Sequence, residues 1–563
     1  MRAAFTGLTP AQGIGGTGCA APASALRSVP MNEPVDVVIV GAGAAGAALA
    51  WSLADTRMRI LCLDQGDWVN PADYPSTRRD WELLAEREFS PEPNVRRRPE
   101  DYPIDDSESP IAIVNFNGVG GSTILYAAHF PRLHPSDFRV RTLDGVADDW
   151  PIDYATLEPW FAENDRMMGV AGLAGDPAYP AHAPNLPHVP LGRVGETMGR
   201  AFNALGWHWW PSETAIATLP YEGRDQCANL GPCKTGCAQG AKASADITYW
   251  PAALRAGVQL RTRCRVARVV VNDADMATGV EYHDADGALH FQPAEVVVLA
   301  CSGVGTPRLL LNSASARFPG GLANRSGLVG KNLMLHPWGM VRGVFEQPLE
   351  SQFGPQSCCI WSQQFYETDP ARGFVRGYNL QVTRGLGPVA TARNGVAAGQ
   401  IPWGAGHHDA FARRFGHIAG IGVCCEDLPE ESNAVTLHPT LADSDGIPAP
   451  KITYRLGENS QRMIRHGVER ATEALKAAGA RDVQSVAPWR PTGWHHLGTA
   501  RMGNDPGRSV VNSWGRSHDV KNLFVVDGSV FVTSGGVNPT PTIQAFALYA
   551  ADQMKRRLAN LFD

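Results

Sequence analysis

Apolar positions near the amino terminus predict a strand, a glycine-rich turn and a helix. Residues 35–40, VDVVIV, form a short β-branched run, and GAGAAG follows at 41–46 before an alanine-rich stretch. A second short apolar run, residues 59–63, ends in Asp64. This pattern predicts a β-strand, a helix and a second β-strand in that order.

Later apolar runs predict further strands and two helices. Residues 260–271 and 279–301 are strand runs, and the Asp-Ala-Asp-Gly turn inside the second suits a hairpin. Residues 459–479 begin as a helix and end in glycine, which predicts a surface helix without chemistry. Residues 522–554 predict a strand, an Asp-Gly turn and a carboxy-terminal helix that starts near Pro539.

Composition indicates a globular protein with two or more structural lobes. The chain has 563 residues, of which 44% are hydrophobic and 19% charged, and a single core rarely grows to that size. The net charge of -6 gives no electrostatic footprint for nucleic acid or anionic lipid. The sequence has no uninterrupted run of about 18 apolar residues, so no membrane-spanning helix is predicted. We therefore expect a small-molecule partner.

The amino-terminal segment and the cysteines bear on location. Residues 1–30 lack the charged start and apolar stretch of a secretory signal, so we expect a disordered extension, or sequence upstream of a true start at Met31. The 11 cysteines are an odd number and include adjacent pairs. This favours reduced thiols in a cytoplasmic protein over a disulfide framework.

The glycine turn has the spacing of a dinucleotide-binding fingerprint. Gly41 permits a tight turn, Gly43 lets the backbone approach a pyrophosphate, and Gly46 lets the helix pack closely on the strand. The following helix start attracts phosphate charge. Asp64 stands 18 residues after Gly46, where its carboxylate can accept hydrogen bonds from an adenosine ribose. The fingerprint alone does not separate NAD from FAD.

Two later segments favour FAD. Residues 118–133, GVGGSTILYAAHFPRL, form a second glycine-rich loop that can bring backbone amides against a flavin. The helix predicted near Pro539 has a positive end that could stabilise negative charge on a reduced flavin ring. A terminal helix that only packs is the alternative interpretation.

Seven stretches occur in the order that a known family shows them. They are VGAGAAG, GVGGST, DDWPIDYATLEPWF, CSGVGTPRLLLNS, LVGKNLMLHP, HHLGTARMG and DGSVFVTSGGVNPTPTIQAFAL. From Val35 onward the chain resembles the glucose-methanol-choline (GMC) flavoprotein oxidoreductases. Within that family it is most similar to the branch of pyranose oxidases, glycoside 3-oxidases and catalytic subunits of bacterial glucoside 3-dehydrogenases, mainly through PYEGRDQC and CKTGCAQGAK.

The resemblance implies an α/β fold with mixed α+β character, in which a Rossmann-like FAD-binding domain is interleaved with a substrate domain on an antiparallel sheet. It assigns residues 31–150, 225–335 and 490–563 to the FAD-binding domain. The substrate-binding domain then takes residues 151–224 and 336–489.

The resemblance also implies which residues contact FAD. Most lie in the two glycine loops, at Asp64 and at the start of the last helix, while Val266 offers a backbone contact to adenine. The set is Gly41, Gly43, Ala44, Ala45, Gly46, Asp64, Gly118, Gly120, Gly121, Ser122, Thr123, Val266, Asp527, Gly528, Asn538, Pro539 and Thr540.

Two departures from family patterns refine the cofactor prediction. Several pyranose oxidases tether the flavin through a histidine shortly after the paired glycines, and alignment through the shared Pro-Arg puts Leu125 at that position. We therefore expect non-covalent FAD, because a tether at His129 would need the loop to shift by four residues.

The second departure is a cysteine loop spaced C-x5-C-x3-C at Cys227, Cys233 and Cys237. Glucoside dehydrogenase subunits of this type hold an iron–sulfur cluster with a similar loop, and such a cluster needs thiolate ligands. The spacing differs slightly, and relatives without a cluster keep cysteines there. A structural loop is the favoured interpretation, and an iron–sulfur cluster is the alternative. Elsewhere in the sequence, no set of His, Cys and carboxylate residues has the spacing of a zinc site.

In the family signature H-x-x-G-T-x-x-M the first histidine is the base, which implies His495, and the family's Gly-Gly-x-(Asn/His)-Pro-Thr turn implies Asn538 as its partner. A neutral imidazole with a pKa of about 6.5 can take the hydroxyl proton while the alcohol carbon transfers hydride to flavin N5. The amide can hold the same oxygen without competing as a base. His496 should point the other way and line the pocket or bond to backbone. His336 and the pair His407 and His408 are expected to serve local structure or a substrate loop.

The predicted reaction is oxidation of a secondary ring hydroxyl, at C2 or C3, of a sugar or glycoside to a ketone. The glycine-rich loop at residues 385–408 could cover the pocket, with Trp403 as a stacking surface for a sugar. Alternatives are a non-sugar alcohol, a dehydrogenase subunit that passes electrons to a redox partner, and a flavin-binding scaffold without catalysis. The sequence does not decide whether the electron acceptor is oxygen, an artificial acceptor or a protein. It also leaves the oligomeric state open.

Overall fold

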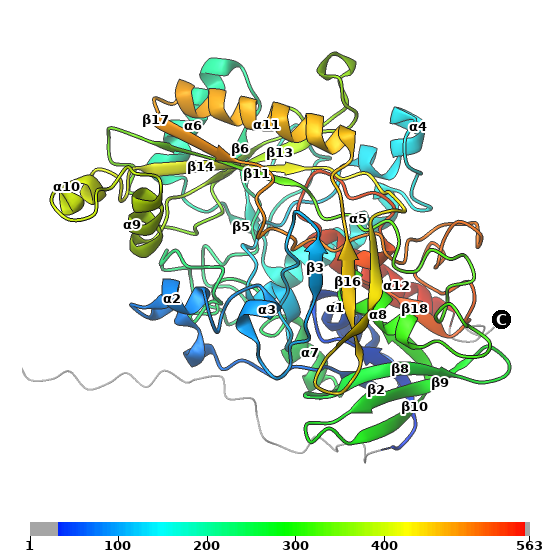
Figure 1. Ribbon diagram of the computed structural model, residues 1–563. Coiled ribbons are helices and arrows are strands. Elements are labelled where there is room, and N and C mark those ends of the chain that lie inside the picture. Colours follow the sequence, from blue (N-terminus) through cyan, green and yellow to red (C-terminus); the bar gives the residue numbers. More distant parts are fainter. Residues whose placement is uncertain (1–31, 558–563) are drawn as a thin grey trace, which may run out of the picture.

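The structure is a computed structural model that describes residues 32–557, so the extension predicted at residues 1–30 lies outside the described residues. Two large sheets dominate it, one mainly parallel and one antiparallel (Figure 1). Helices and strands alternate through most of the chain. The predicted mixed α/β fold class is confirmed.

The mainly parallel sheet has the strand order β7-β2-β1-β10-β9-β8, and β18 pairs with β10. Its strands are β1 (Val35–Val40), β2 (Ile60–Leu63), β7 (Gln259–Arg261), β8 (Arg265–Val271), β9 (Ala277–His283), β10 (Leu289–Leu299) and β18 (Leu523–Val525). β1 runs parallel to β2 and β10, whereas β8, β9 and the start of β10 form an antiparallel extension. The predicted strand-helix-strand unit and the predicted hairpin are therefore confirmed.

Helices cover the parallel sheet and bring the two ends of the chain together. α1 (Ala44–Leu53) packs against α7 (Tyr249–Arg255) and α12 (Thr540–Arg556), and α12 also packs against α5 (Tyr154–Met168). α8 (Ser302–Asn312) packs against β8. α12 begins directly after Pro539, as the sequence predicts.

The second sheet is antiparallel, with the order β17-β11-β14-β13-β12-β6. Its strands are β6 (Trp210–Pro211), β11 (Trp338–Val344), β12 (Ile360–Ser362), β13 (Tyr378–Thr383), β14 (Ile418–Cys425) and β17 (Arg481–Val486). α6 (Gly192–Leu205) and α11 (Glu458–Ala477) lie over one face of this sheet (Figure 1). α11 is the helix predicted at residues 459–479, and it buries Met463, Ala471 and Leu475 in the core of this layer.

Shorter elements complete the fold. A small sheet joins β15 (Ala434–Ala442), β16 (Pro448–Thr453) and β3 (Asp105–Glu108), and β4 (Ala171–Gly172) pairs with β5 (Leu186–Pro187). The remaining α-helices are α2 (Trp81–Ala85), α3 (Pro93–Arg96), α4 (Val140–Asp144), α9 (Pro388–Ala397) and α10 (His407–Ala412). The 3-10 helices are η1 (Pro71–Asp73), η2 (Pro75–Thr77), η3 (Gly121–Ile124), η4 (Pro135–Phe138), η5 (Pro370–Arg372) and η6 (Gly528–Val530).

The loop predicted at residues 385–408 is wrong in part. Residues 385–408 were expected as a glycine-rich loop, but they contain α9 and the start of α10. Pro388 stands at the first helical position, where its fixed φ suits a helix start and its missing N–H costs nothing. The composition of glycine and proline thus concealed a short helix.

Within residues 32–557, no helix combines the length and the apolar character that crossing a bilayer requires. The ten cysteines in this range are all free thiols. No disulfide therefore contributes to the described part of the fold.

Candidate active site

A cavity of about 540 Å³ is lined by residues from both large sheets. Val40 and Leu63 come from the parallel sheet, and Trp338, Met340 and Gln381 come from the antiparallel one. The end at the parallel sheet carries the predicted nucleotide residues, and we call it the cofactor end. The opposite end, at the antiparallel sheet, is called the substrate end.

Most residues predicted to bind the cofactor line this cavity. They are Gly41, Gly43, Ala44, Ala45, Asp64, Gly118, Gly121, Ser122, Thr123, Val266, Asp527, Gly528, Asn538, Pro539 and Thr540. Gly46 and Gly120 are not among the lining residues. A Cβ at Gly46 would lie 2.0 Å from the Gly41 carbonyl oxygen, so this position serves close packing of α1 on the turn.

Asp64 ends β2 beside the glycine turn. Its Oδ2 accepts a hydrogen bond from the Ala42 backbone N–H at 2.7 Å, and its Oδ1 accepts one from the Gly66 N–H at 2.8 Å. Burial raises the pKa of its carboxyl to about 6, and the two backbone donors counteract that rise. Each oxygen keeps a lone pair for a ribose hydroxyl.

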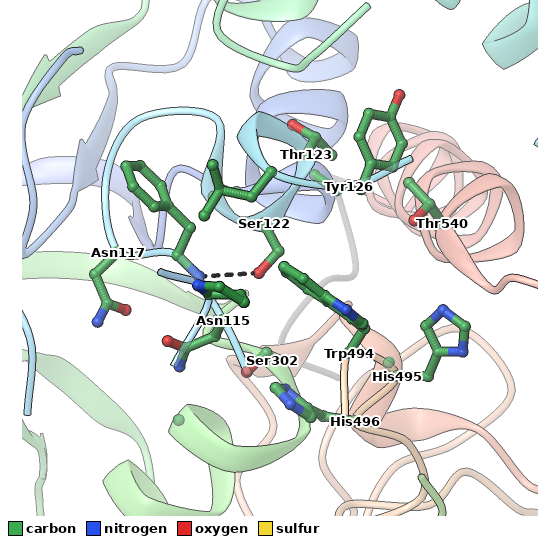
Figure 2. A pocket seen from close by; sticks show the side chains of 18 of the residues that line it. Asn115, Asn117, Ser122, Thr123, Tyr126, Ser302, Trp494, His495, His496 and Thr540 are labelled. Atoms are coloured by element: carbon green, nitrogen blue, oxygen red, sulfur yellow. Dashed lines mark hydrogen bonds between the residues drawn. The ribbon is translucent and has the colours of Figure 1, made fainter. Parts of the chain in front are cut away.

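The second glycine loop approaches the first. Gly121 has a φ of +54°, and a Cβ on it would lie 2.8 Å from Gly43 Cα. Ser122 Oγ accepts a hydrogen bond from the Phe116 N–H at 3.2 Å (Figure 2). Thr123 Oγ1 donates to the Gly120 carbonyl at 2.6 Å. A side chain at Gly121 is thus excluded where the two backbone turns meet at the cavity.

Two helix starts face the cavity. α1 begins beside Gly43 and α12 begins at Thr540, and neither carries an acidic residue in its first turn. Their free N–H groups give each start a partial positive charge. Together with the glycine cradle and Asp64, these residues fit a dinucleotide with its pyrophosphate at α1 and a ring system near α12.

The buried His336 and the partly buried His495 form a hydrogen-bonded pair at the substrate end. His336 Nε2 lies 2.6 Å from the Gly535 carbonyl oxygen, and its Nδ1 lies 2.7 Å from Nδ1 of His495. A carbonyl can only accept, so His336 carries its proton on Nε2 and accepts on Nδ1. Burial lowers the pKa of His336 to about 4, which keeps it neutral.

This pair fixes the protonation of the second ring. Because His336 Nδ1 accepts, His495 must donate from its own Nδ1, and its Nε2 then holds the lone pair. Burial, with His336 as a further cause, lowers the pKa of His495 well below its usual range. His495 lines the cavity as a neutral imidazole. The sequence predicted a role for His336 in local structure or a substrate loop, and no pattern indicated its contact with His495.

Asn538 lines the same cavity as His495. Its Oδ1 accepts a hydrogen bond from Gln381 Nε2 at 2.7 Å. The Asn538 amide nitrogen therefore has its two hydrogens available for a substrate oxygen. Gln381, which also lines the cavity, is a second residue that the sequence did not single out.

A buried cluster of charged residues contacts the turn that precedes Asn538, through Tyr366 and Gly536. Arg376 pairs with Asp137 and with Glu426 in the interior. Tyr366 donates from its hydroxyl to Asp137 at 2.8 Å and accepts from the Gly536 N–H at 2.9 Å. Removing one partner of such a cluster would leave a buried charge uncompensated.

The structure places the weaker sequence candidates in different surroundings. His496 lines the cavity and its Nε2 contacts the Gly493 carbonyl at 2.8 Å, and it points away from His495 (Figure 2). Trp403 is not among the cavity residues and is 89% exposed between α9 and α10. Among the described residues, the tryptophans that line the cavity are Trp81, Trp338, Trp489 and Trp494.

The loop with Cys227, Cys233 and Cys237 stands beside the cavity. Pro232, Lys234 and Thr235 of this loop line the cavity, whereas the three cysteines do not. Burial raises the pKa of the Cys233 thiol to about 11. The loop therefore contributes a lysine to the substrate end, a residue that the cysteine pattern did not bring to notice.

A set of potential metal ligands surrounds His495, although their positions in the sequence show no metal-site spacing. Within residues 32–557, His336, Cys424 and His495 are the three whose ligand atoms all lie within 4.8 Å of one another. The two Nδ1 atoms are 2.7 Å apart, whereas two nitrogens on one tetrahedral zinc would be about 3.3 Å apart. The spacing is that of a hydrogen bond.

Comparison with known proteins agrees with this arrangement. The sequence models described as GMC oxidoreductase match residues 212–338 and 429–547, and an NAD(P)-binding Rossmann-like domain matches residues 39–69. 2-Methyl-1,2-propanediol dehydrogenase of Mycolicibacterium austroafricanum is 41% identical over 94% of this chain and 97% of that protein. Fructose dehydrogenase large subunit of Gluconobacter japonicus is 29% identical over 92% and 97%.

A solved structure shows the same fold at low identity. A variant of formate oxidase from Aspergillus oryzae RIB40 superposes with a TM-score of 0.68 at 16% identity, over 94% of this chain and 100% of that one. The likeness of fold therefore extends over nearly the whole described chain, including both large sheets.

Proposed function

This chain belongs to the GMC oxidoreductase family, and we propose that it is an FAD-dependent enzyme in which His495 removes the hydroxyl proton of an alcohol. The observation that carries the proposal is the His336–His495 hydrogen bond, which leaves His495 Nε2 unprotonated beside the cavity. Bound FAD would supply the two-electron acceptor for the alcohol carbon.

The proposed proton transfer uses only residues already placed in the cavity. His495 Nε2 takes the proton from the substrate hydroxyl, and the resulting imidazolium donates from Nδ1 to His336. Asn538 donates to the substrate oxygen and holds it in line. Because the site is buried, these hydrogen bonds act in a low-dielectric environment.

The predicted cofactor contacts at both glycine loops, Asp64 and the start of α12 are proposed as the FAD site. Leu125 lines the cavity at the position where some relatives have a tethering histidine, which supports non-covalent FAD. We further propose that residues 31–150, 225–335 and 490–563 form the FAD-binding domain. A structural role is proposed for the cysteine loop.

For the substrate, we propose a secondary ring hydroxyl of a sugar or glycoside, at C2 or C3, as in the pyranose and glycoside oxidoreductase branch. The fructose dehydrogenase relative and the tryptophans at the cavity support this. A short diol is a second candidate because the 41% identical relative is named for 2-methyl-1,2-propanediol. Oxygen or an artificial or protein acceptor is proposed to reoxidise the flavin.

Anaerobic bleaching of the flavin tests this function. Holoenzyme is mixed with glycosides, diols and simple alcohols, and His495→Ala is compared with the exposed His408→Ala as a control. We expect bleaching by at least one alcohol, and a loss of about 10²–10⁴-fold in its rate for His495→Ala alone. A His495→Ala enzyme that bleaches at the wild-type rate would remove the proposed base.

A further inference from the structure

Two cations at the substrate end have no anionic partner. Lys234 lines the cavity from the cysteine loop, and Arg342 is on β11; both are half-buried. In the described part of the chain, neither side chain has a hydrogen bond or ion pair with another residue. By contrast, Arg308 at the cofactor end of the same cavity pairs with Asp443 at 2.7 Å.

The lack of compensation is unfavourable without a ligand. Burial lowers the pKa of Lys234, and the nearby Arg342 lowers it further. Burial alone lowers the pKa of Arg342. Partly buried charges in folded proteins are normally paired, because desolvation of an unpaired ion is costly. Lys234 lines the large cavity and Arg342 lines a smaller adjoining pocket, and Met340 lines both, so the two cations flank a boundary that suits an anionic ligand.

Arg342 belongs to the sheet face that forms the floor of the substrate end. Trp338, Met340 and Arg342 alternate along β11 and therefore share one face. Trp338 and Met340 line the cavity, and the Trp338 ring lies 6.3 Å from that of His495. Trp338 and Arg342 are four positions apart along the strand, a distance of about 13 Å. The floor thus runs from the base to the arginine.

Arg342 lines the smaller pocket and packs against a wall residue of the large cavity. Its guanidinium carbon stands 5.4 Å from the ring centre of Trp489, which lines the cavity and donates its backbone N–H to Trp338 at 2.7 Å. On the adjacent strand, Gly420 has no side chain, and a Cβ there would lie 3.3 Å from Arg342 Cγ. The arginine therefore extends over an unobstructed strand beside the aromatic wall.

Acidic groups around this end are few and already engaged. In the described residues, the carboxylates that line the large cavity are Asp64 and Asp527, both at the cofactor end. Asp482 lines the adjoining smaller pocket with Arg342, but it pairs with Arg414 at 3.5 Å. The substrate end therefore carries a local excess of positive charge.

We propose that Lys234 and Arg342 form an anion subsite for a carboxylate or phosphate on the alcohol that His495 deprotonates. This inference rests on the proposed alcohol oxidation. Because Arg342 stands far along the strand from Trp338, the anionic group lies at the far end of the substrate from the oxidised carbon. The substrate class is an anionic polyol, such as a sugar acid or a sugar phosphate.

Matched substrates test the subsite in anaerobic holoenzyme. Methyl glucoside is compared with its uronic acid and 6-phosphate counterparts, and 1,2-butanediol with 3,4-dihydroxybutanoate. The measured quantity is the rate constant for flavin reduction divided by the Kd of the substrate. We expect this ratio to be at least about tenfold higher for an anionic substrate than for its neutral counterpart. The preferred anion, carboxylate or phosphate, identifies the source of the charge. Equal values for neutral and anionic members would overturn the proposal.

Variants separate the subsite from general effects. Lys234→Met and Arg342→Met should raise the Kd of the anionic substrate about 10- to 100-fold and leave that of the neutral counterpart within about twofold. Arg342→Lys should recover part of the affinity. Equal effects on both substrates would overturn the subsite.

A binding measurement keeps the test independent of turnover. Inorganic phosphate is titrated calorimetrically into wild-type holoenzyme and into Arg342→Met. Binding that the variant loses supports the subsite even if no alcohol bleaches the flavin, an outcome that would refute only the proposed function. Absence of phosphate binding together with no anionic preference overturns the subsite.

Discussion

Replacement of His336 tests whether a positioning residue controls the base. His336 accepts the Nδ1–H of His495 at 2.7 Å and is itself fixed by the Gly535 carbonyl at 2.6 Å. When His495 takes a proton, that contact becomes a charge-assisted hydrogen bond, worth about 1.5–3 kcal/mol. Its loss corresponds to roughly a 10- to 150-fold lower rate, since about 1.36 kcal/mol is a factor of ten.

The backbone at this position suggests a matched pair of variants. His336 has a φ of +51°, which asparagine tolerates better than other non-glycine residues. In His336→Asn the amide oxygen takes the place of Nδ1 as acceptor, whereas His336→Leu removes the acceptor. We expect the leucine variant to lose most of the rate and the asparagine variant to keep most of it.

Stopped-flow flavin bleaching under anaerobic conditions measures the effect. FAD content and urea unfolding of each variant show whether the protein is intact. kcat should fall with little change in KM, and His336→Leu combined with His495→Ala should be no slower than His495→Ala alone, because the two residues act as one unit. An intact His336→Leu enzyme with the wild-type rate would show that another contact sets the His495 tautomer.

Three further predictions follow from burial and backbone geometry. The lowered pKa of His495 keeps it neutral in mild acid, so kcat should stay level as pH falls through about 6.5; a titration with that midpoint would contradict it. Gly121→Val should yield folded but colourless protein, because its Cβ would meet Gly43 at 2.8 Å, while the exposed Gly145→Ala should keep its flavin, measured as the 450 nm to 280 nm absorbance ratio. Buried His129, with its pKa lowered to about 4, stays neutral while the unfolded chain takes up a proton below about 6.5. Urea unfolding of wild type should therefore lose about 2 kcal/mol more between pH 7 and 5 than that of His129→Gln; equal losses would refute this.

Local patterns explain which parts of the fold could be predicted from the sequence. The strand at Val35–Val40, the helix after it and the helix from Thr540 each follow from a run of residues and a nearby glycine or proline. The second sheet gave weaker patterns, because β6 and β12 have only two and three residues. Its strand order depends on pairings between distant segments, which no local pattern encodes.

The site shows the same division between local and distant information. The motif around His495 predicts a base, but the nitrogen that would accept the proton depends on His336, which is 159 residues away. The motif LMLHP offered no reason to connect them, because its histidine needs the +51° backbone turn to reach across. Similarly, the pattern in the loop around Lys234 concerned only its cysteines. Arg342 lies in a strand that carries no sequence motif. Their proposed role depends on the absence of a carboxylate partner among the described residues. That absence is visible only in the folded chain, because the neighbouring segments are distant in sequence. Motifs therefore predict the groups that perform the chemistry, whereas protonation and substrate charge are set by long-range contacts that the fold creates.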